Sequence, residues 1–412
     1  LPTFRRWRKP TGIDVPRLNF VDQSEVQKGE VQMNVTTVGV DLAKHVFAVC
    51  EGDGRGHGGR SSILKQGEFL KWLRTLPAGT VVAMEACSSA HSWGRTMQAL
   101  GLEPRLIAAE FVRPYRKNQR VKNDSRDAEA VLTALHAPGM RFVTIKTEDQ
   151  QQRLAWHRLR EGWKAERTAL FNRIRGLLTE FGIVVELGAT KIRRKLAELE
   201  GDEAYPQNIR LMAQCVREQV GMLDQRLAEC ERQIARQSKN DPVVARLRSR
   251  PGIGLLSADA IVATVGDARQ FKNGRQFAAS LGITPRQHGS GGKTHLGAIT
   301  RRGDSYLRCL FVQGARCVLQ AALRLHKNKP DTLNRLQLWM VKLNDRVGYH
   351  KAAVAIANKH ARQVWAMLTR GETYNADAYK DWEAAHANVC PGDIHRASDD
   401  DLSTAALAAA SV

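Results

Sequence analysis

Val35-Thr-Thr-Val-Gly-Val-Asp41 decides the fold of the first part of this chain. It is an apolar, β-branched run that ends in a carboxylate, and a second such run, His45 to Cys50, follows after three residues. Two runs so close together predict a hairpin of strands with Asp41 near its tip. The glycine-rich stretch 52–59 then turns the chain toward Ser61 to Leu64, which predicts a third antiparallel strand.

The pattern of a strand followed by an acid occurs again at Thr80-Val-Val-Ala-Met-Glu85, after a helical segment from Gln66 to Arg74. Another short strand is predicted at Pro104 to Ala109. Asp124-Ser-Arg-Asp127 opens an apolar-periodic helix, and the i, i+3 spacing places both aspartates on one helical face. This order of elements predicts an RNase H-like α/β domain that presents four acids together.

The four acids, Asp41, Glu85, Asp124 and Asp127, suit a divalent metal site. Carboxylates gathered in a folded site repel one another, whereas one or two Mg²⁺ ions neutralise them and act on the oxygens of a phosphodiester. Each acid alone also has a plainer explanation: Asp41 or Glu85 as a solvated loop acid, Asp124 as a helix N-cap, and Asp127 as a favourable charge near the helix N-terminus. Their joint occurrence in this order favours the metal site.

The charge of the chain agrees with a nucleic-acid partner. There are 63 Lys and Arg against 42 Asp and Glu, which gives a formal net charge of +21. Such a chain attracts polyanions in a salt-dependent way, although charge does not separate DNA from RNA. The basic residues cluster at Phe4 to Lys9, Arg113 to Lys122 and Arg153 to Arg175, where a solvated face is the usual explanation of any one run.

The length and the cysteines restrict the class of protein. The 412 residues allow two or three domains, and no apolar stretch is as long as a membrane span. The seven cysteines form no CxxC pair, which argues against a zinc module or a disulfide framework and predicts a reducing, cytoplasmic compartment. We expect five segments: a disordered or irregular extension (1–33), the RNase H-like domain (34–147), a helical coiled-coil segment (148–240), a mainly helical C-terminal domain (241–372) and a tail (373–412).

The middle segment carries a seam of apolar residues at three-and-four spacing. Its members are Ile209, Met212, Val216, Val220, Leu223, Leu227, Cys230 and Ile234. Such a seam is typical of a coiled coil. Packing against the chain's own helix around Leu154 to Phe181 and self-association explain it equally well. That helix also carries arginines beside Trp156 and Trp163, which suit either a nucleic-acid face or a merely solvated one.

Two turns mark the C-terminal region. Pro251-Gly-Ile-Gly254 between helices resembles a helix-hairpin-helix element, whose backbone N–H groups can hold a phosphate, although such a turn also occurs as plain helix punctuation. Further on, the glycines around Ser290 predict an exposed hydroxyl on a loop, near His288, Lys293 and His295. That serine suits attack on a phosphodiester, and taken in isolation it also suits a simple turn.

These motifs, taken in order, resemble those of the DEDD insertion-sequence transposases. The matching segments are Val-Gly-Val-Asp41-Leu-Ala-Lys, Met-Glu85-Ala, Lys122-Asn-Asp-Ser-Arg-Asp127, Pro251-Gly-Ile-Gly254, Gly282-Ile-Thr-Pro-Arg-Gln-His-Gly-Ser-Gly291 and Arg302-Gly-Asp-Ser-Tyr-Leu-Arg308. The resemblance spans about residues 35 to 370. Residues 1–33 and the Ala-rich tail have no counterpart in that family pattern.

The resemblance implies a RuvC-like (RNase H-like) domain, a coiled-coil segment and a C-terminal transposase domain. By position, Asp41, Glu85, Asp124 and Asp127 would bind Mg²⁺, and Ser290 would join covalently to cleaved DNA. Members of that family act as recombinases guided by a structured bridge RNA that pairs with donor and target DNA. They form homo-oligomers, here a dimer or tetramer, whose composite sites take the acids and the serine from different subunits. The expected compartment is the bacterial cytoplasm, near the nucleoid, with no membrane partner.

Two other functions stay open at this point. A metal-only nuclease of the same fold that resolves Holliday junctions would need the four acids and no serine. A non-enzymatic nucleic-acid scaffold would need only the positive charge.

Overall fold

The computed structural model describes four stretches of the chain, residues 37–52, 58–116, 124–291 and 293–375. The predicted extension 1–33 and nearly all of the tail 373–412 lie outside them. The described residues form two compact units, the first from 37–90 and 96–141 and the second from 91–95 and 142–375. Each unit is described by itself below.

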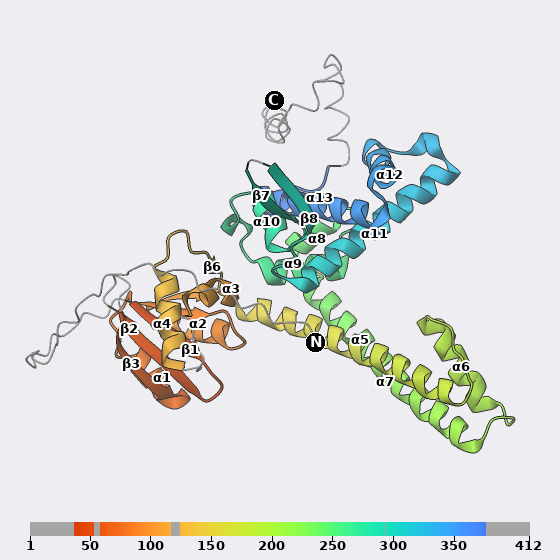
Figure 1. The fold of residues 1–412 in the computed structure, drawn as a ribbon, viewed down its shortest axis with the longest axis horizontal. Coiled ribbons are helices and arrows are strands. Elements are labelled where there is room, and N and C mark those ends of the chain that lie inside the picture. The colour runs from red at the N-terminus through yellow and green to blue at the C-terminus, as the bar shows by residue number, and fades with distance from the viewer. Residues whose placement is uncertain (1–36, 53–57, 117–123, 292, 376–412) are drawn as a thin grey trace, which may run out of the picture. The chain divides into compact units, whose positions relative to one another are not determined.

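A mixed sheet forms the first unit, apart from its short edge strand Phe142–Val143, which lies just past that unit's last residue (Figure 1). The strand order is β3-β2-β1-β4-β5-β6, with β1 antiparallel to β2, β2 antiparallel to β3, and β1 and β5 both parallel to β4. The strands are β1 (Thr37–Leu42), β2 (Val46–Gly52), β3 (Gly58–Lys65), β4 (Val81–Glu85), β5 (Glu103–Ile107) and β6 (Phe142–Val143). The three antiparallel strands predicted from the glycine-rich turn are therefore confirmed.

Five short helices accompany this sheet. They are α1 (Gln66–Leu73), α2 (Ala90–Ala99), α3 (Ala109–Val112), the 3-10 turn η1 (Arg113–Tyr115) and α4 (Asp124–Leu135). The apolar face of α4, including Ala128, Val131 and Leu132, is buried against the sheet. This packing sets the position of the first turn of α4 relative to the strand ends.

Gly39 in β1 permits the close approach of α4. A Cβ atom at this position would lie 2.3 Å from the carbonyl oxygen of Ala128 and 2.7 Å from the amide nitrogen of Leu132. Any side chain here would push the helix away from the strand. The glycine in Val-Gly-Val-Asp is thus a packing requirement, and it brings α4 next to the strand that carries Asp41.

Helices dominate the second unit. They are α5 (Glu148–Glu180), α6 (Ala189–Gly201), α7 (Gln207–Ser238), α8 (Pro242–Arg248), α9 (Leu255–Val265), η2 (Ala268–Gln270), α10 (Gly274–Ser280), α11 (Ser305–Asn328), η3 (Pro330–Thr332), α12 (Arg335–Val347) and α13 (Tyr349–Arg370). A hairpin of β7 (Pro285–Ser290) and β8 (Lys293–Ile299) is inserted between α10 and α11. Helices α8 to α13 surround one apolar core that includes Phe277 and Phe311.

Helices α5 and α7 run side by side as a long antiparallel pair with α6 at its far end (Figure 1). The predicted seam on α7 faces the chain's own helices: Val220, Leu223, Leu227 and Ile234 are buried. Ile209 and Val220 share a core with residues of α5 and α6. The intramolecular explanation of the seam therefore holds in this structure. None of the helices in the four described stretches is long and apolar enough to cross a bilayer.

Candidate active site

Asp41 and Glu85 lie at the same edge of the sheet of the first unit. Strands β1 and β4 are parallel, and their last paired residues are Val40 and Met84. Asp41 and Glu85 each follow by one residue, so the two carboxylates leave neighbouring strands at matching positions. The pattern of a strand followed by an acid thus places both where the sequence predicted.

Helix α4 brings Asp127 to these two acids. Asp127 is buried in the first turn of α4, with a relative exposure of 9%. The negative charges of Asp41 and Asp127 both raise the pKa of the Glu85 carboxyl, in keeping with their placement near one edge of the sheet. Asp124 is the first residue of the same helix, but its side chain lies outside the described atoms.

An arginine that the sequence analysis did not single out lies between two of the acids. The Arg116 Nη2 atom is 2.5 Å from Glu85 Oε1, and its Nε atom is 3.1 Å from Asp127 Oδ1. Arg116 belongs to the run Arg113 to Lys122, for which a solvated face was the usual explanation. Only the fold reveals that this residue reaches the acids, because it lies 31 residues from Glu85 in sequence.

Burial dominates the electrostatics of Glu85. Loss of solvent raises the pKa of its carboxyl, the guanidinium of Arg116 lowers it, and the charges of Asp41 and Asp127 raise it again. The net direction is upward. Glu85 is therefore a carboxylate whose charge costs free energy unless a cation is close.

The acids fit a divalent cation by the chemistry of their donors. They offer carboxylate oxygens at one sheet edge, the ligands that Mg²⁺ prefers, and a guanidinium already stands between two of them as a cation. In the described part of the chain, no three His, Cys, Asp or Glu groups already stand close enough to hold an ion together. Arg116 separates two of the acids, and the side chain of Asp124 is not among those described.

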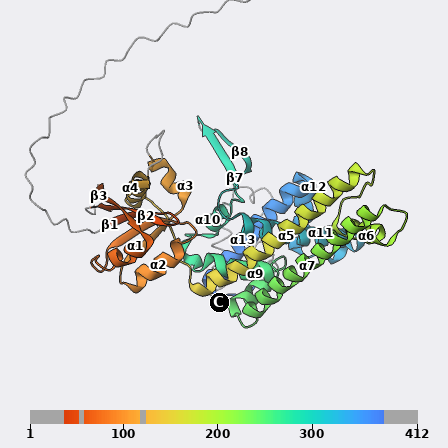
Figure 2. The same cartoon turned by 90° about the horizontal axis from the view of Figure 1, so that it is seen from below.

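Ser290 belongs to the second unit and ends strand β7. The expected loop is wrong, because the stretch forms an antiparallel hairpin that stands out from the helices of its unit (Figure 2). The residues of β7 are proline, glycine or polar, so no alternation of apolar and polar residues indicated a strand. Every residue of β7 is exposed. The expected exposure of Ser290 is confirmed.

The hairpin register gathers basic residues around the serine. Ser290 pairs with Lys293 across the turn, and His288 pairs with His295. Since side chains alternate along a strand, these four residues share one face of the ribbon, with Arg286 further back on the same face. Residues 285–299 contain no Asp or Glu. The serine hydroxyl is thus surrounded by groups that attract a phosphate or accept a proton.

A tight neck holds the base of this hairpin. Gly303 has φ 74°, and a Cβ there would lie 1.8 Å from the carbonyl oxygen of Ser280. Arg308 donates from Nη1 to the carbonyl oxygens of Leu281 (2.9 Å) and Arg302 (3.1 Å). The segment Arg302 to Arg308 therefore has a structural role in fixing the hairpin.

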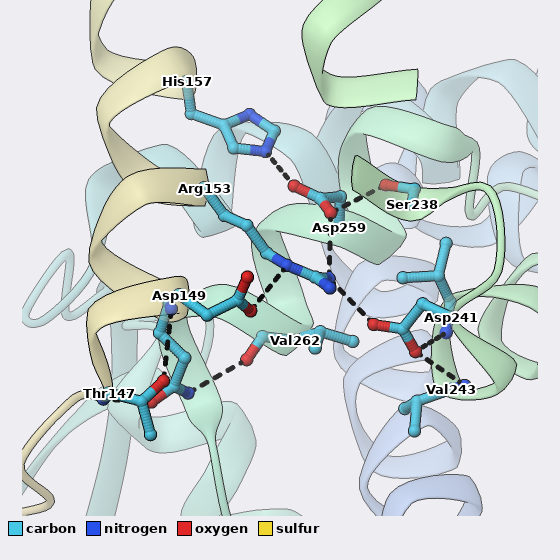
Figure 3. Close-up of polar contacts among 11 residues, drawn as sticks. Thr147, Asp149, Arg153, His157, Ser238, Asp241, Val243, Asp259 and Val262 are labelled. Carbon is cyan, nitrogen blue, oxygen red and sulfur yellow. Dashed lines mark hydrogen bonds and ion pairs between the residues drawn. The ribbon is translucent and has the colours of Figure 1, made fainter. Parts of the chain in front are cut away.

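Several arginines of the basic face expected on α5 are used inside the protein. Arg153 donates to Asp241 (2.8 Å) and Asp259 (3.2 Å), and it also pairs with Asp149 (Figure 3). The fully buried Asp259 accepts from Ser238 and contacts His157 Nε2 at 2.9 Å. These contacts tie α5 to α9 and to the N-cap of α8, and Ser238 ties the end of α7 to α9.

The next turns of α5 repeat this use of arginine. Arg160 pairs with Glu231 and Arg167 with Asp224, and both partners lie on α7. Trp163 lies 5.2 Å from the guanidinium of Arg226, also on α7. These arginines therefore stabilise the helix pair, while Arg158, Lys164 and Arg173 of the same helix stay exposed.

The Pro251-Gly-Ile-Gly254 turn joins α8 to α9 as the sequence predicted, and helix α11 packs directly on it. A Cβ at Gly314 would lie 1.9 Å from the carbonyl oxygen of Gly252. The N–H of Ile253 donates to the carbonyl oxygen of Arg250 (3.0 Å). One side of the turn is thus covered by helix α11. That the backbone N–H groups of the turn bind a phosphate stays a prediction.

His360 lies buried beside this turn. Burial, together with the positive charges of Arg250 and Lys359, lowers its pKa to about 3. Within the described residues, neither ring nitrogen has a hydrogen-bond partner. In the native protein this imidazole therefore stays neutral around pH 6.5, where the same histidine in the unfolded chain takes up a proton.

We expect His360 to weaken the protein at acidic pH. Below its unfolded pKa, near 6.5, the unfolded chain binds a proton that the native protein excludes, so the free energy of unfolding falls as the pH falls. The loss is about 1 kcal/mol between about pH 7 and pH 5.5. Measured by urea unfolding at both pH values, the loss should be smaller in His360→Met than in the parent by about this amount. His326→Met, at an exposed position of α11, serves as the control. Equal slopes in the parent and His360→Met would contradict the assignment.

Two protein-family models match the chain. A DEDD transposase model of the IS110 type covers residues 38–183. A model described as the transposase IS116/IS110/IS902 family covers residues 244–329. The first match contains the three described acids, and the second contains Ser290 together with the neck of its hairpin.

Known proteins agree with both models over most of the chain. A probable family 20 transposase of Pseudomonas aeruginosa is 41% identical over 345 residues, which are 83% of this chain and 99% of the relative. The transposase for insertion sequence element IS1111A of Coxiella burnetii is 38% identical over 84% of this chain and 93% of its own length. The transposase for element IS1328 of Yersinia enterocolitica is 36% identical over 83% of this chain and 99% of its own length.

The chain belongs to the IS110 family of DEDD transposases. This transposase is therefore an enzyme that acts on DNA, and the scaffold alternative is wrong. DEDD enzymes of this nuclease-like kind generally depend on a divalent metal. The acids on the sheet of the first unit are the groups of this transposase that suit such an ion.

Proposed function

We propose that this transposase is a recombinase that cleaves and exchanges DNA strands through a covalent link to Ser290. In this mechanism Asp41, Glu85, Asp124 and Asp127 hold Mg²⁺. The observation that carries the proposal is the placement of Ser290, exposed at the end of β7 on a face with four basic groups and no acid. A serine with only a structural role in a turn needs no such surroundings.

The serine step forms one bond and breaks another. The Ser290 hydroxyl oxygen attacks phosphorus, and the bond from phosphorus to one deoxyribose oxygen breaks. The hydroxyl proton passes to His288 or His295, which share its face, and the leaving oxygen takes up a proton to become a free hydroxyl. Lys293, directly opposite Ser290, stabilises the negative charge that develops on the phosphate. The phosphoserine link then lets a second strand's hydroxyl displace the serine without an external energy source.

The acids act on the same phosphodiester from their own unit. Bound Mg²⁺ would neutralise the carboxylates and polarise a phosphate oxygen. Asp41 and Glu85 are held rigidly by the register of β1 and β4, and Asp127 is held by the packing of α4 on Gly39. Rigid placement matters because a ligand displaced by about 1 Å orients the scissile phosphate poorly.

Two further parts of the proposal rest on the family resemblance and on charge. A structured bridge RNA supplies the choice of donor and target DNA, in keeping with the net charge of +21 on the chain. Subunits assemble as a dimer or tetramer, so that the acids of one subunit serve the serine of another. Because the α7 seam is used within the chain, that contact would have to use another surface.

The test is to trap the covalent intermediate. We expect the full-length protein, its guide RNA and a nicked DNA substrate that loses its leaving strand to give a protein–DNA adduct that survives denaturation in Mg²⁺ and is absent in EDTA. Peptide mapping should find the nucleotide on Ser290. Cleavage in Mg²⁺ with no adduct would instead support a metal-only junction nuclease.

A further inference from the structure

Arg116 contacts two of the acids that are proposed to bind the metal ion. It follows directly after η1 at the edge of the sheet, and its guanidinium joins Glu85 (Nη2, 2.5 Å) to Asp127 (Nε, 3.1 Å). The two carboxylate side chains are 15% and 13% exposed, whereas the arginine side chain is 39% exposed. The acids are therefore held in place by the fold, and Arg116 is the more accessible partner.

Two cations compete for these carboxylate oxygens. A guanidinium does not lose its proton in proteins, so Arg116 cannot become neutral to admit a second cation. Arg116 contacts one oxygen of each carboxylate, Oε1 of Glu85 and Oδ1 of Asp127, so a divalent ion that takes these oxygens displaces it. An ion on the other two oxygens would still lie close to the guanidinium, where the two positive charges repel. Metal binding at the acids therefore favours the departure of Arg116.

We propose that Arg116 is a displaceable counter-ion of the acid site, which the metal releases for binding a DNA phosphate. The inference rests on the proposed metal site and adds a residue to it. Released from the acids, the guanidinium presents a planar set of donors that fits a phosphate bidentately. It stays within one side-chain length of the acids, where the scissile strand must lie.

This exchange couples metal binding to DNA binding. With no metal present, the acids hold Arg116 and repel the phosphates of DNA. Metal at the acids frees a positive side chain for DNA, and DNA that holds Arg116 leaves the acids open to metal. Linkage requires the two effects to be equal in magnitude. Arg116 is thus a positioning residue that keeps the site closed until both substrate and metal are present.

Metal binding without DNA gives the first test. Titration of the full-length protein with Mn²⁺, followed by the electron-spin resonance signal of the free ion, should show Arg116→Gln binding about tenfold more tightly than the parent, because its competitor is gone. Arg116→Lys, which keeps the charge but lacks the planar, pre-organised set of donors of the guanidinium, should fall between them. Arg113→Gln removes an equal charge from the exposed η1 turn and should bind Mn²⁺ as the parent does.

DNA binding gives the second test, with Ca²⁺ in place of Mg²⁺ so that the DNA stays intact. The parent should bind DNA more tightly in Ca²⁺ than in EDTA, and this gain should be about threefold smaller in Arg116→Gln. Arg113→Gln should keep the parental gain.

The Mn²⁺ titrations distinguish the role of Arg116 from the existence of the metal site. Unchanged Mn²⁺ affinity in a folded Arg116→Gln protein, or an increase that Arg113→Gln matches, would overturn the role of Arg116 alone. A parent protein that binds no Mn²⁺, or binds it equally well as Asp127→Asn, would overturn the metal site and the inference together. Neither result bears on which residue carries the covalent adduct.

Discussion

Ser290→Ala will not form a covalent adduct with DNA and will recombine at least about 10³-fold more slowly than the parent, because it lacks the oxygen that bonds to phosphorus. The fold should survive the change, since Ser290 is exposed and ends a strand whose residues are all exposed. Binding of guide RNA and DNA should therefore stay near the parental level. Denaturing gels of nicked DNA, read beside gel-shift assays on the same samples, measure the two effects.

Two matched variants sharpen this test. Ser290→Cys keeps a nucleophile at the same position and should still form an adduct. That adduct is linked through sulfur instead of oxygen, so its chemical stability should differ from that of the serine adduct. Gln287→Ala lies on the opposite face of the hairpin, where it pairs with Leu296, and should form the adduct normally. An Ser290→Ala protein that recombines at the parental rate would remove this serine from the mechanism.

Asp127→Asn should lower DNA cleavage by at least about 10²-fold, the scale seen when a group that stabilises transition-state charge is lost. The amide has nearly the same shape, so the packing of α4 on β1 should persist. What changes is the charge and one metal ligand, together with the ion pair to Arg116. Time courses of cleavage across a range of Mg²⁺ concentrations measure the effect, and high Mg²⁺ should restore part of it if metal affinity is the main loss.

The control is an acid of the same unit that lies away from the site. Glu103→Gln, exposed at the start of β5 and paired with Val81 at the other end of the strand pair from Glu85, removes the same charge and should cleave DNA at the parental rate. Gel shifts should show that Asp127→Asn still binds DNA. Full cleavage by Asp127→Asn would mean that the acid cluster has another role.

The strand ends could be predicted because local patterns set them. A β-branched run that stops at a carboxylate predicts both a strand and an acid at its end, and parallel pairing of β1 with β4 then brings Asp41 and Glu85 together. Asp127 needed only the helical period and an apolar face on α4. In each case the deciding contacts are close in sequence or follow from one sheet register.

The contacts that were missed join distant segments. Arg116 reaches Glu85 across 31 residues, and Arg153 reaches Asp259 across 106 residues. A basic run looks the same whether its members face water or a buried acid, so charge alone did not distinguish them. The hairpin of β7 and β8 was missed for another reason: it buries neither face, and without burial there is no alternation of apolar and polar residues to recognise.

Because the base of the hairpin is fixed near Gly303, the number of residues in each strand sets how far Ser290 lies from that base. Both strands of the hairpin start from one fixed point, where Thr300 donates to the carbonyl oxygen of Thr284 at 2.9 Å. Adding two residues to each strand would carry Ser290 outward by roughly 7 Å and keep it on the basic face. Adding one to each strand would turn Ser290, together with Lys293 and the histidines, to the opposite side of the hairpin. Related enzymes that grip DNA at different depths can thus be expected to differ here in steps of two.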